Sequence, residues 1–333
     1  MNDLEKLLDT SDGPVDTERA LARMRARVER ERIRPATRLG AGASGPIVSI
    51  WVKGLAAAAS VALVAVLLTA SGVAETILTI FEPKQVAAVP ITAGDVANAM
   101  NGLGSYGTLT WSTQPQPYEV PDLATAARDS GLAVLTPSQL PSGVNAATVH
   151  YGVMPKTTAT FTFSAQRTQD SAARLGRTPP PMPANIDGSR LFLTGGPAVV
   201  QYYGDGTHPA PATADPFAML PKLVVVEGSA PLVQSDGVTV EQLQQYLLAQ
   251  PGITPQLAAE IRAIKDPSST LPIPIPVDMA TSKNVTVQGS PGVFIGDSTG
   301  LGSAVIWQKG GVVYAVAGTL SEAQIMAVAN SLR

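Results

Sequence analysis

The chain contains one run of 21 residues without a charged side chain, from Gly54 to Ala74, between Lys53 and Glu75. A helix rises about 1.5 Å per residue, so a helix of this length spans roughly the 30 Å hydrocarbon core of a bilayer. Leucines and valines supply the apolar character of the run, and its alanines add little, which predicts modestly favourable insertion. The run therefore predicts a single transmembrane helix over residues 54–74.

Two other interpretations of this run remain open. The run is also compatible with a buried helix of a soluble domain. A cleaved signal peptide is the second alternative, because Gly72-Val73-Ala74 has the small residues of a cleavage site. Signal peptides have short charged regions before their apolar part, whereas 53 residues precede this run. We therefore expect a membrane anchor rather than a cleaved signal.

The charges on either side of the run predict its orientation. Eight arginines lie within residues 19–38 against two glutamates, which gives this segment a net charge of +6. Residues 75–333 hold 13 Lys or Arg and 18 Asp or Glu. Because positive charges are retained on the cytoplasmic side, we expect residues 1–52 in the cytoplasm and residues 75–333 outside the cell membrane. The mildly acidic outer part does not indicate a nucleic-acid partner.

Residues 1–52 are expected to form a cytoplasmic arm and tether. Asp16 is a good N-cap residue, and the sequence that follows it is rich in Ala, Arg and Glu, which favours a short helix. Leu21, Met24 and Val28 form a narrow apolar stripe on one face of this helix. Two interpretations of the helix remain open. Either its arginines hold it against anionic lipid head groups, or the stripe is the binding site for a cytoplasmic protein.

Beyond the run, we expect residues 75–120 to form a stalk that leads into an outer domain, residues 121–333. Short strands are predicted at 109–112, 118–120, 147–153, 158–164, 190–193, 198–203 and 222–227, and within 132–144 before a proline-containing turn. The strands 190–193 and 198–203 are expected to pair with each other. Helices are predicted at 91–101, 122–130, 240–249 and 255–264, with Asp122 as the N-cap of the second helix and Gly131 as the glycine that ends it. The proline-rich stretch 271–278 indicates polyproline II. Antiparallel-looking strands with helices in separate blocks predict an α+β fold, with antiparallel sheets and packed helices.

The C-terminal segment 304–332 gives the clearest local pattern. Ala304–Gln308 and Val312–Ala317 alternate as strands do, and a turn with two glycines joins them, which predicts a hairpin. Ser321 is expected to cap a final helix. We expect this segment to pack on strands from the 147–164 region, so that each strand buries one face.

Two parts of the outer region resemble a known kind of domain. Leu135–Gly143 (LTPSQLPSG) resembles a strand followed by P-x-x-L-P-x-G. Ala304–Tyr314, with Gly318–Ser321 and Ala329–Leu332, resembles a W-x-x-x-G-x-x-Y hairpin followed by a G-x-L-S helix cap and a closing A-x-S-L. Both are similar to the uncharacterised extracytoplasmic domain of membrane-anchored anti-sigma-factor-like proteins. The resemblance implies a sensor-like outer domain and a sigma factor as the cytoplasmic partner.

The residue types that most often carry chemistry are scarce. The chain has no cysteine, which excludes disulfides and thiolate zinc sites, and its two histidines are His150 and His208. Gly102–Gly107 matches G-x-G-x-x-G, but a helix is predicted before it and a strand after it, the reverse of the dinucleotide motif. Leu248–Pro255 resembles the turn of helix-hairpin-helix DNA-binding modules, yet few cations lie near it, which favours simple helix packing. We expect no catalytic residue, no metal site and no cofactor.

Two hypotheses for function follow from these patterns. The first is a regulatory or sensor protein of the anti-sigma-factor type, with an extracytoplasmic domain whose ligand the sequence does not identify. The second is a membrane-tethered module of the cell envelope that binds or scaffolds and does not signal. An extracytoplasmic enzyme is disfavoured because no nucleophile and base are found in a known pattern.

Overall fold

The computed structural model describes residues 77–92, 95, 104–204, 221–251, 253–298, 300 and 302–333. These residues all belong to one unit of the chain, Ser44–Arg333. The uncharged run 54–74 and the arm residues Leu21, Met24 and Val28 lie outside the described residues, so the predictions made for them stay predictions. Among the residues that are described, no helix is long and apolar enough to cross a membrane.

Four stretches of the chain each pass through two different sheets, with a proline-containing interruption between the two halves. The stretches are β3 (Gly107–Thr113) with β4 (Tyr118–Val120), β5 (Val149–Met154) with β6 (Thr157–Phe163), β7 (Arg190–Gly195) with β8 (Ala198–Tyr203), and β9 (Leu223–Ser229) with β10 (Leu232–Ser235). The interruptions contain Pro115 and Pro117, Pro155, Pro197 and Pro231. Because proline has no backbone N–H to donate to a neighbouring strand, it ends the pairing at each interruption.

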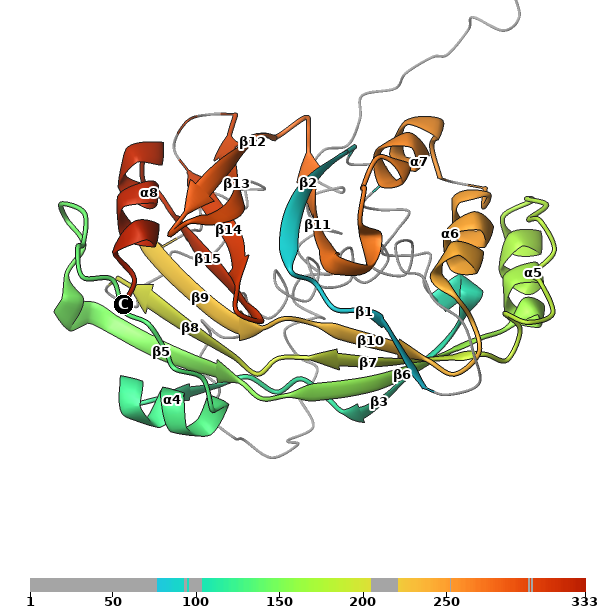
Figure 1. The fold of residues 1–333 in the computed structure, drawn as a ribbon, viewed down its shortest axis with the longest axis horizontal. Helices are drawn as coiled ribbons and strands as arrows, with labels where there is room; N and C mark the ends of the chain where they lie inside the picture. Colours follow the sequence, from blue (N-terminus) through green and yellow to red (C-terminus); the bar gives the residue numbers. More distant parts are fainter. Residues whose placement is uncertain are drawn as a thin grey trace, which may run out of the picture. The chain divides into compact units, whose positions relative to one another are not determined.

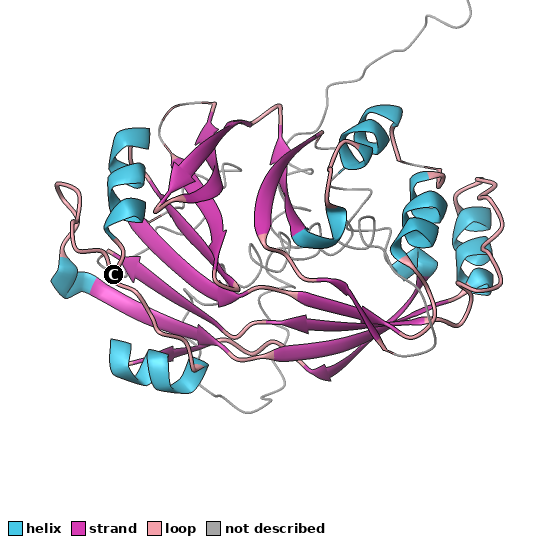
Figure 2. Ribbon diagram, viewed as in Figure 1, coloured by secondary structure: helices cyan, strands magenta, loops and turns pink. Residues whose placement is uncertain are grey.

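One half of each stretch lies in a five-stranded sheet and the other half in an eight-stranded sheet (Figures 1 and 2). The five-stranded sheet has the order β1-β10-β7-β6-β3, where β1 is Leu78–Phe81, and all its pairs are antiparallel. The eight-stranded sheet has the order β12-β13-β14-β15-β9-β8-β5-β4 and is also antiparallel. Its remaining strands are β12 (Ala280–Val287), β13 (Ser290–Asp297), β14 (Ser303–Lys309) and β15 (Val312–Gly318).

A third, two-stranded sheet pairs β2 (Gln85–Ile91) with β11 (Thr270–Pro276) in parallel. The prediction of polyproline II for the proline-rich stretch 271–278 is wrong, because most of it lies in β11. The prolines fall at alternate positions, Pro272, Pro274 and Pro276, and N–H groups at alternate positions of a strand point to the same edge. The missing donors therefore all lie on one edge, and the other edge remains free to pair with β2.

The described helices begin at well-capped positions. They are α4 (Leu123–Ser130), α5 (Ala165–Arg174), α6 (Val240–Leu248), α7 (Pro255–Arg262) and α8 (Glu322–Ser331), with short 3₁₀ turns η2 (Ala146–Thr148) and η3 (Pro267–Ser269). An Asp, Ser or Thr before each α-helix accepts a hydrogen bond from a backbone N–H of its first turn. The predicted caps Asp122 and Ser321 are confirmed, as is Gly131, which ends α4 with φ 71°.

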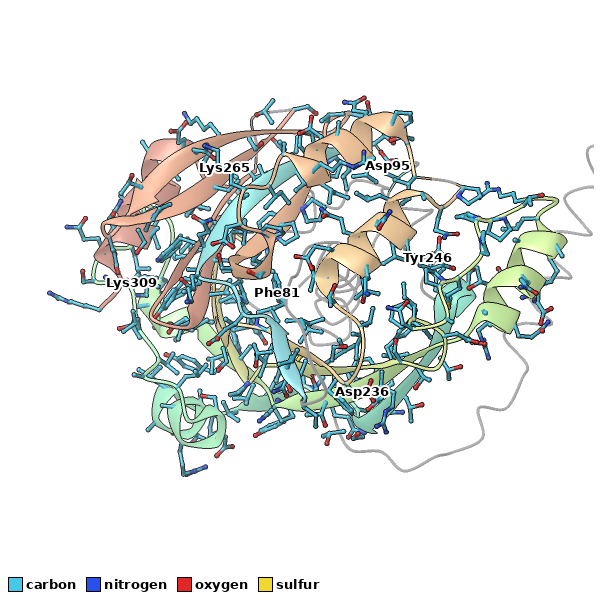
Figure 3. The ribbon with its side chains drawn as sticks, turned by 45° about the vertical axis from the view of Figure 1, so that its right-hand side comes forward. Phe81, Asp95, Asp236, Tyr246, Lys265 and Lys309 are labelled. Carbon is cyan, nitrogen blue, oxygen red and sulfur yellow. The ribbon has the colours of Figure 1, made fainter. Side chains whose placement is uncertain are left out.

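Two large apolar cores hold the unit together. The first lies between the five-stranded sheet, the two-stranded sheet and the helices α6 and α7, and it includes Phe161, Leu243 and Ile261. Phe81 on β1 and Tyr246 on α6, both labelled in Figure 3, belong to this core. The second core lies between the eight-stranded sheet and α8, around Trp307 and Ile325, and Figure 1 shows α8 beside β14 and β15. The predicted α+β class, with mostly antiparallel sheets, is confirmed.

Several strand assignments differ from the sequence-based expectation. The segment 132–144 is extended but joins no sheet, and only one isolated bridge, Pro137 to Leu332, involves it. The strands β7 and β8 do not pair with each other, because Pro197 lies in a continuation of the chain rather than in a hairpin turn. The C-terminal hairpin is confirmed, but β15 pairs with β9 and not with strands from 147–164.

The described residues of the predicted stalk, 75–120, contribute strands to all three sheets. β1 pairs with β10, β2 with β11, β3 with β6 and β4 with β5. The hairpin of β12 and β13 was not expected from the sequence, because β12 is a largely exposed and polar edge strand.

Candidate functional site: a buried carboxyl group beneath an extended strap

An extended segment, Leu132–Val144, runs from the end of α4 to the region of α8 over the eight-stranded sheet, and we call it the strap. Near its start, Leu132 and Val134 pack with α4, β5 and β8. Further on, Leu135 and Leu140 pack with the core beneath α8. The strap contains 13 residues and no charged side chain. It therefore covers the sheet mainly through apolar contacts.

Backbone hydrogen bonds fasten the strap to the end of the chain. Thr136 N–H donates to the carbonyl oxygen of Arg333 at 3.1 Å, and Arg333 N–H donates back to Thr136 at 3.2 Å. Ser138 donates from its N–H at 3.2 Å and from its hydroxyl at 2.9 Å to the carbonyl oxygen of Ser331. Lys222 Nζ donates to the carbonyl oxygen of Gly143 at 2.9 Å. These contacts satisfy strap backbone groups that no regular sheet satisfies.

At Leu135 the backbone of the strap is held by two side chains of the sheet instead. The N–H of Leu135 donates to Glu227 Oε1 at 2.8 Å. Gln201 Nε2 donates to the carbonyl oxygen of Leu135 at 2.6 Å, and Gln201 Oε1 accepts from Tyr203 Oη at 3.2 Å. Glu227 is 1% exposed and Gln201 is 0% exposed. The carboxyl and amide groups thus make the hydrogen bonds to Leu135 that the backbone of a neighbouring strand would make in a sheet.

The strand register explains why these polar groups meet. Glu227 on β9 lies opposite Tyr314 on β15, and Gln201 on β8 lies opposite Val225 on β9. Side chains alternate along a strand, so Val225 and Glu227 face the same side, together with their partners on β8 and β15. This is the face that α8 and the strap cover. Tyr314 and Glu227 thus form one row across β15 and β9, and Gln201 lies diagonal to Glu227 on β8.

Aromatic rings extend the row beyond Glu227. Tyr314 stacks on Trp307 with ring centroids 5.2 Å apart and planes at 15°. The indole N–H of Trp307 is fully buried, and it has no hydrogen-bond partner among the described residues. A buried donor without a partner is uncommon in folded proteins. The two stacked rings therefore add no charged group beside Glu227.

The electrostatic consequence is a carboxyl group that titrates near neutral pH. Burial raises the pKa of Glu227 from 4.5 to about 7, and the hydrogen bond from Leu135 N–H opposes this increase only in part. Glu227 takes part in no ion pair of the described ranges. Burial also raises the pKa of Tyr314, and the neighbouring Glu227 adds to that increase. Desolvation therefore outweighs the single hydrogen bond that favours the carboxylate.

The residues singled out from the sequence lie elsewhere. His150 is exposed on β5 and stacks on Tyr202, with ring centroids 5.3 Å apart. His208 lies outside the described residues. The described groups of His, Asp and Glu include no cluster that could hold a metal ion. Gly104–Tyr106 forms a helical turn directly before β3, so this glycine segment does not have the strand-before-helix order of a dinucleotide site.

Sequence reasoning missed Glu227 and Gln201 as site residues. Glu227 was treated as the last residue of a buried strand, although β9 continues to Ser229. The sequence contained one signal for Glu227, its position in the strand. Side chains alternate along β9, so Glu227 points to the same buried face as Leu223 and Val225. Gln201 follows the same rule on β8, between Val199 and Tyr203.

Comparisons with known proteins identify no relative of this chain. A scan against protein-family models, a search of curated proteins and a search of solved structures each found no match. The site is therefore interpreted from its own geometry. That geometry provides a proton-binding group at the contact between a strap and a sheet, and it offers no nucleophile with an adjacent base.

Proposed function

We propose that this chain is a single-pass membrane protein of a regulatory kind, with its N-terminal arm in the cytoplasm and a sensing or binding domain outside. The observation that carries the proposal is the short connection between the apolar run and the fold. The run ends at Ala74, and β1, which pairs with β10, begins at Leu78. An anchor over 54–74 would therefore hold the folded unit directly at the membrane surface.

The arm provides the regulatory part of this proposal. Its Leu21, Met24 and Val28 stripe would bind a cytoplasmic protein, and a sigma factor is the partner that the resemblance of the outer part implies. The segment that resembles anti-sigma-factor-like proteins includes the strap from Leu135 onwards, and the strap is held by a buried ionisable group. A segment of this kind suits a domain that changes conformation more than it suits a catalytic pocket.

A tethered binding or scaffold module without signalling is the second candidate, and β12 favours it. This edge strand pairs with β13 over eight consecutive residue pairs, from Ala280 to Val287, without a bulge or a proline. Most of its residues are exposed. An open edge of this kind can accept a further strand from another polypeptide through backbone hydrogen bonds.

The arm separates the two candidates. Residues 1–52 used as bait should retain a sigma factor, and changing Leu21 and Met24 to Ser should abolish this binding while membrane association persists. Reversing the charge of Arg25, Arg30 and Arg34 should instead weaken membrane association if the helix only contacts lipid. An unchanged transcriptome in a deletion strain, with no sigma factor retained by the arm, would leave the scaffold module as the function.

The topology needs a separate measurement. Alkaline phosphatase is active only outside the cytoplasm, so a fusion after Pro83 should be active and a fusion after Leu39 should be inactive. The reverse pattern would contradict the proposed orientation, and activity at neither site would contradict the anchor.

A further inference from the structure

The contact between Glu227 and Leu135 joins the strap to the sheet through an ionisable group. The N–H of Leu135 donates to Glu227 Oε1 at 2.8 Å, and this carboxyl group is 1% exposed. Its neighbour Gln201 has no titratable group and completes the contact on the other side of Leu135. Glu227 therefore holds the strap backbone through a side chain whose charge depends on pH.

The elements packed around Glu227 bring no compensating cation to it. From β15 it faces the phenol of Tyr314. On β8 it lies opposite Val199 and diagonal to Gln201, so that strand adds no charge beside it. The strap contributes no charged side chain. A carboxylate at this position would have to be stabilised by a single backbone N–H, which is much less than water provides.

Charged groups on the neighbouring helices are engaged elsewhere. On α4, Arg128 pairs with Asp129 at 2.9 Å. On α8, Glu322 pairs with Lys283 of β12 at 2.8 Å. Lys222, at the start of β9, donates to Gly143 near the end of the strap. The strap over Glu227 therefore closes most favourably when the carboxyl group is protonated.

We propose that Glu227 is a proton-controlled clasp: when protonated it keeps the strap Leu132–Val144 closed on the eight-stranded sheet, and loss of its proton to solvent favours release of the strap. The proton passes to water, and the open strap lets water reach both carboxylate oxygens. This inference concerns the outer domain alone and does not depend on the membrane anchor or on a partner of the arm. It gives the domain a chemical signal to which it can respond.

The size of the effect follows from proton linkage. An acid whose pKa is raised in the closed state stabilises that state fully below the pKa of the open state. The stabilisation is lost as the pH increases through the closed-state pKa. With pKa 4.5 in the open state and about 7 in the closed state, the ratio of open to closed strap increases most steeply between these values. From pH 5 to pH 8 the ratio should rise by roughly 70-fold.

Hydrogen–deuterium exchange of the full chain in detergent or nanodiscs measures this ratio directly. Protection of peptides that cover Leu132–Val144, after correction for the intrinsic exchange rate at each pH, should fall by one to two orders of magnitude from pH 5 to pH 8. Peptides that cover β6, in the five-stranded sheet, should keep their protection. Equal losses in the strap and in β6 would show global unfolding and would overturn the proposal.

Matched substitutions assign the effect to the carboxyl group. Glu227→Gln keeps an oxygen that accepts from Leu135 N–H and cannot ionise, so the strap should have nearly the same protection at pH 5 and pH 8. Glu241→Gln removes an exposed carboxylate from α6 and should retain the wild-type dependence. If Glu227→Gln fails to fold, Glu227→Met, which is apolar and of similar size, serves instead. A strap whose pH dependence survives in the folded variant would refute the clasp.

Discussion

Replacing Ile325 by alanine tests whether α8 is part of the second core, the one around Trp307. Ile325 is fully buried against the eight-stranded sheet, in the same cluster as Trp307 and Val316. The substitution removes three buried carbons, worth about 0.8 kcal/mol each, or about 2.4 kcal/mol together. The cavity that remains adds to this cost, so the free energy of unfolding should fall by about 3–4 kcal/mol. For a domain of this size the melting temperature should fall by roughly 10 °C.

Urea denaturation of the full chain in detergent, followed by circular dichroism, is the appropriate assay. The midpoint should move to lower urea while the slope of the transition stays unchanged, because the fold itself is retained. Glu322→Ala on the exposed side of the same helix is the control. It removes only a surface ion pair with Lys283, and it should cost less than about 1 kcal/mol. If Ile325→Ala stays within about 0.5 kcal/mol of the unaltered chain, α8 is an appendage and the core has been assigned wrongly.

Three further predictions concern single residues. The free energy of unfolding should fall between pH 4.5 and pH 7, because the folded state keeps a proton on Glu227 that the unfolded chain releases. The loss due to this group is about 3 kcal/mol, and denaturation of Glu227→Gln over the same pH range should not show it. Ser321→Ala removes the capping box of α8 and should cost about 1 kcal/mol in the same assay, whereas Ser321→Asp, which can still cap, should cost less. Gly318→Ala should lower the melting temperature or prevent folding, because a Cβ at this site would overlap the carbonyl oxygen of Lys222, the residue directly before β9. An unchanged melting temperature would contradict the pairing of β15 with β9.

Local features were predictable from the sequence, because neighbouring residues determine them. Asp122 and Ser321 cap α4 and α8 through their own first turns, and Gly131 takes the left-handed conformation that ends α4. The hairpin of β14 and β15 is closed by Gly310 and Gly311, both with positive φ. None of these requires knowledge of a distant part of the chain.

Long-range pairing was not predictable in the same way. The local pattern predicts that β7 and β8 pair with each other, whereas Pro197 ends only the pairing within each sheet and lets the chain continue into a second sheet. β11 was missed because its prolines suggest polyproline II, and only the distant β2 shows that one edge of the segment is free to pair. Glu227 is a site residue only because the strap from 92 residues earlier reaches it. Such contacts depend on topology, which one sequence does not determine.

The proline interruptions have a consequence for how this unit reaches a single structure. Only two residues separate β5 from β6, β7 from β8, and β9 from β10. A slip of one residue in either sheet would be carried through these short links into the other, where it would turn apolar side chains towards water. The strand register of each sheet therefore constrains the register of the other during folding. A register shift in one sheet would cost free energy in both sheets, which favours the native register over shifted alternatives.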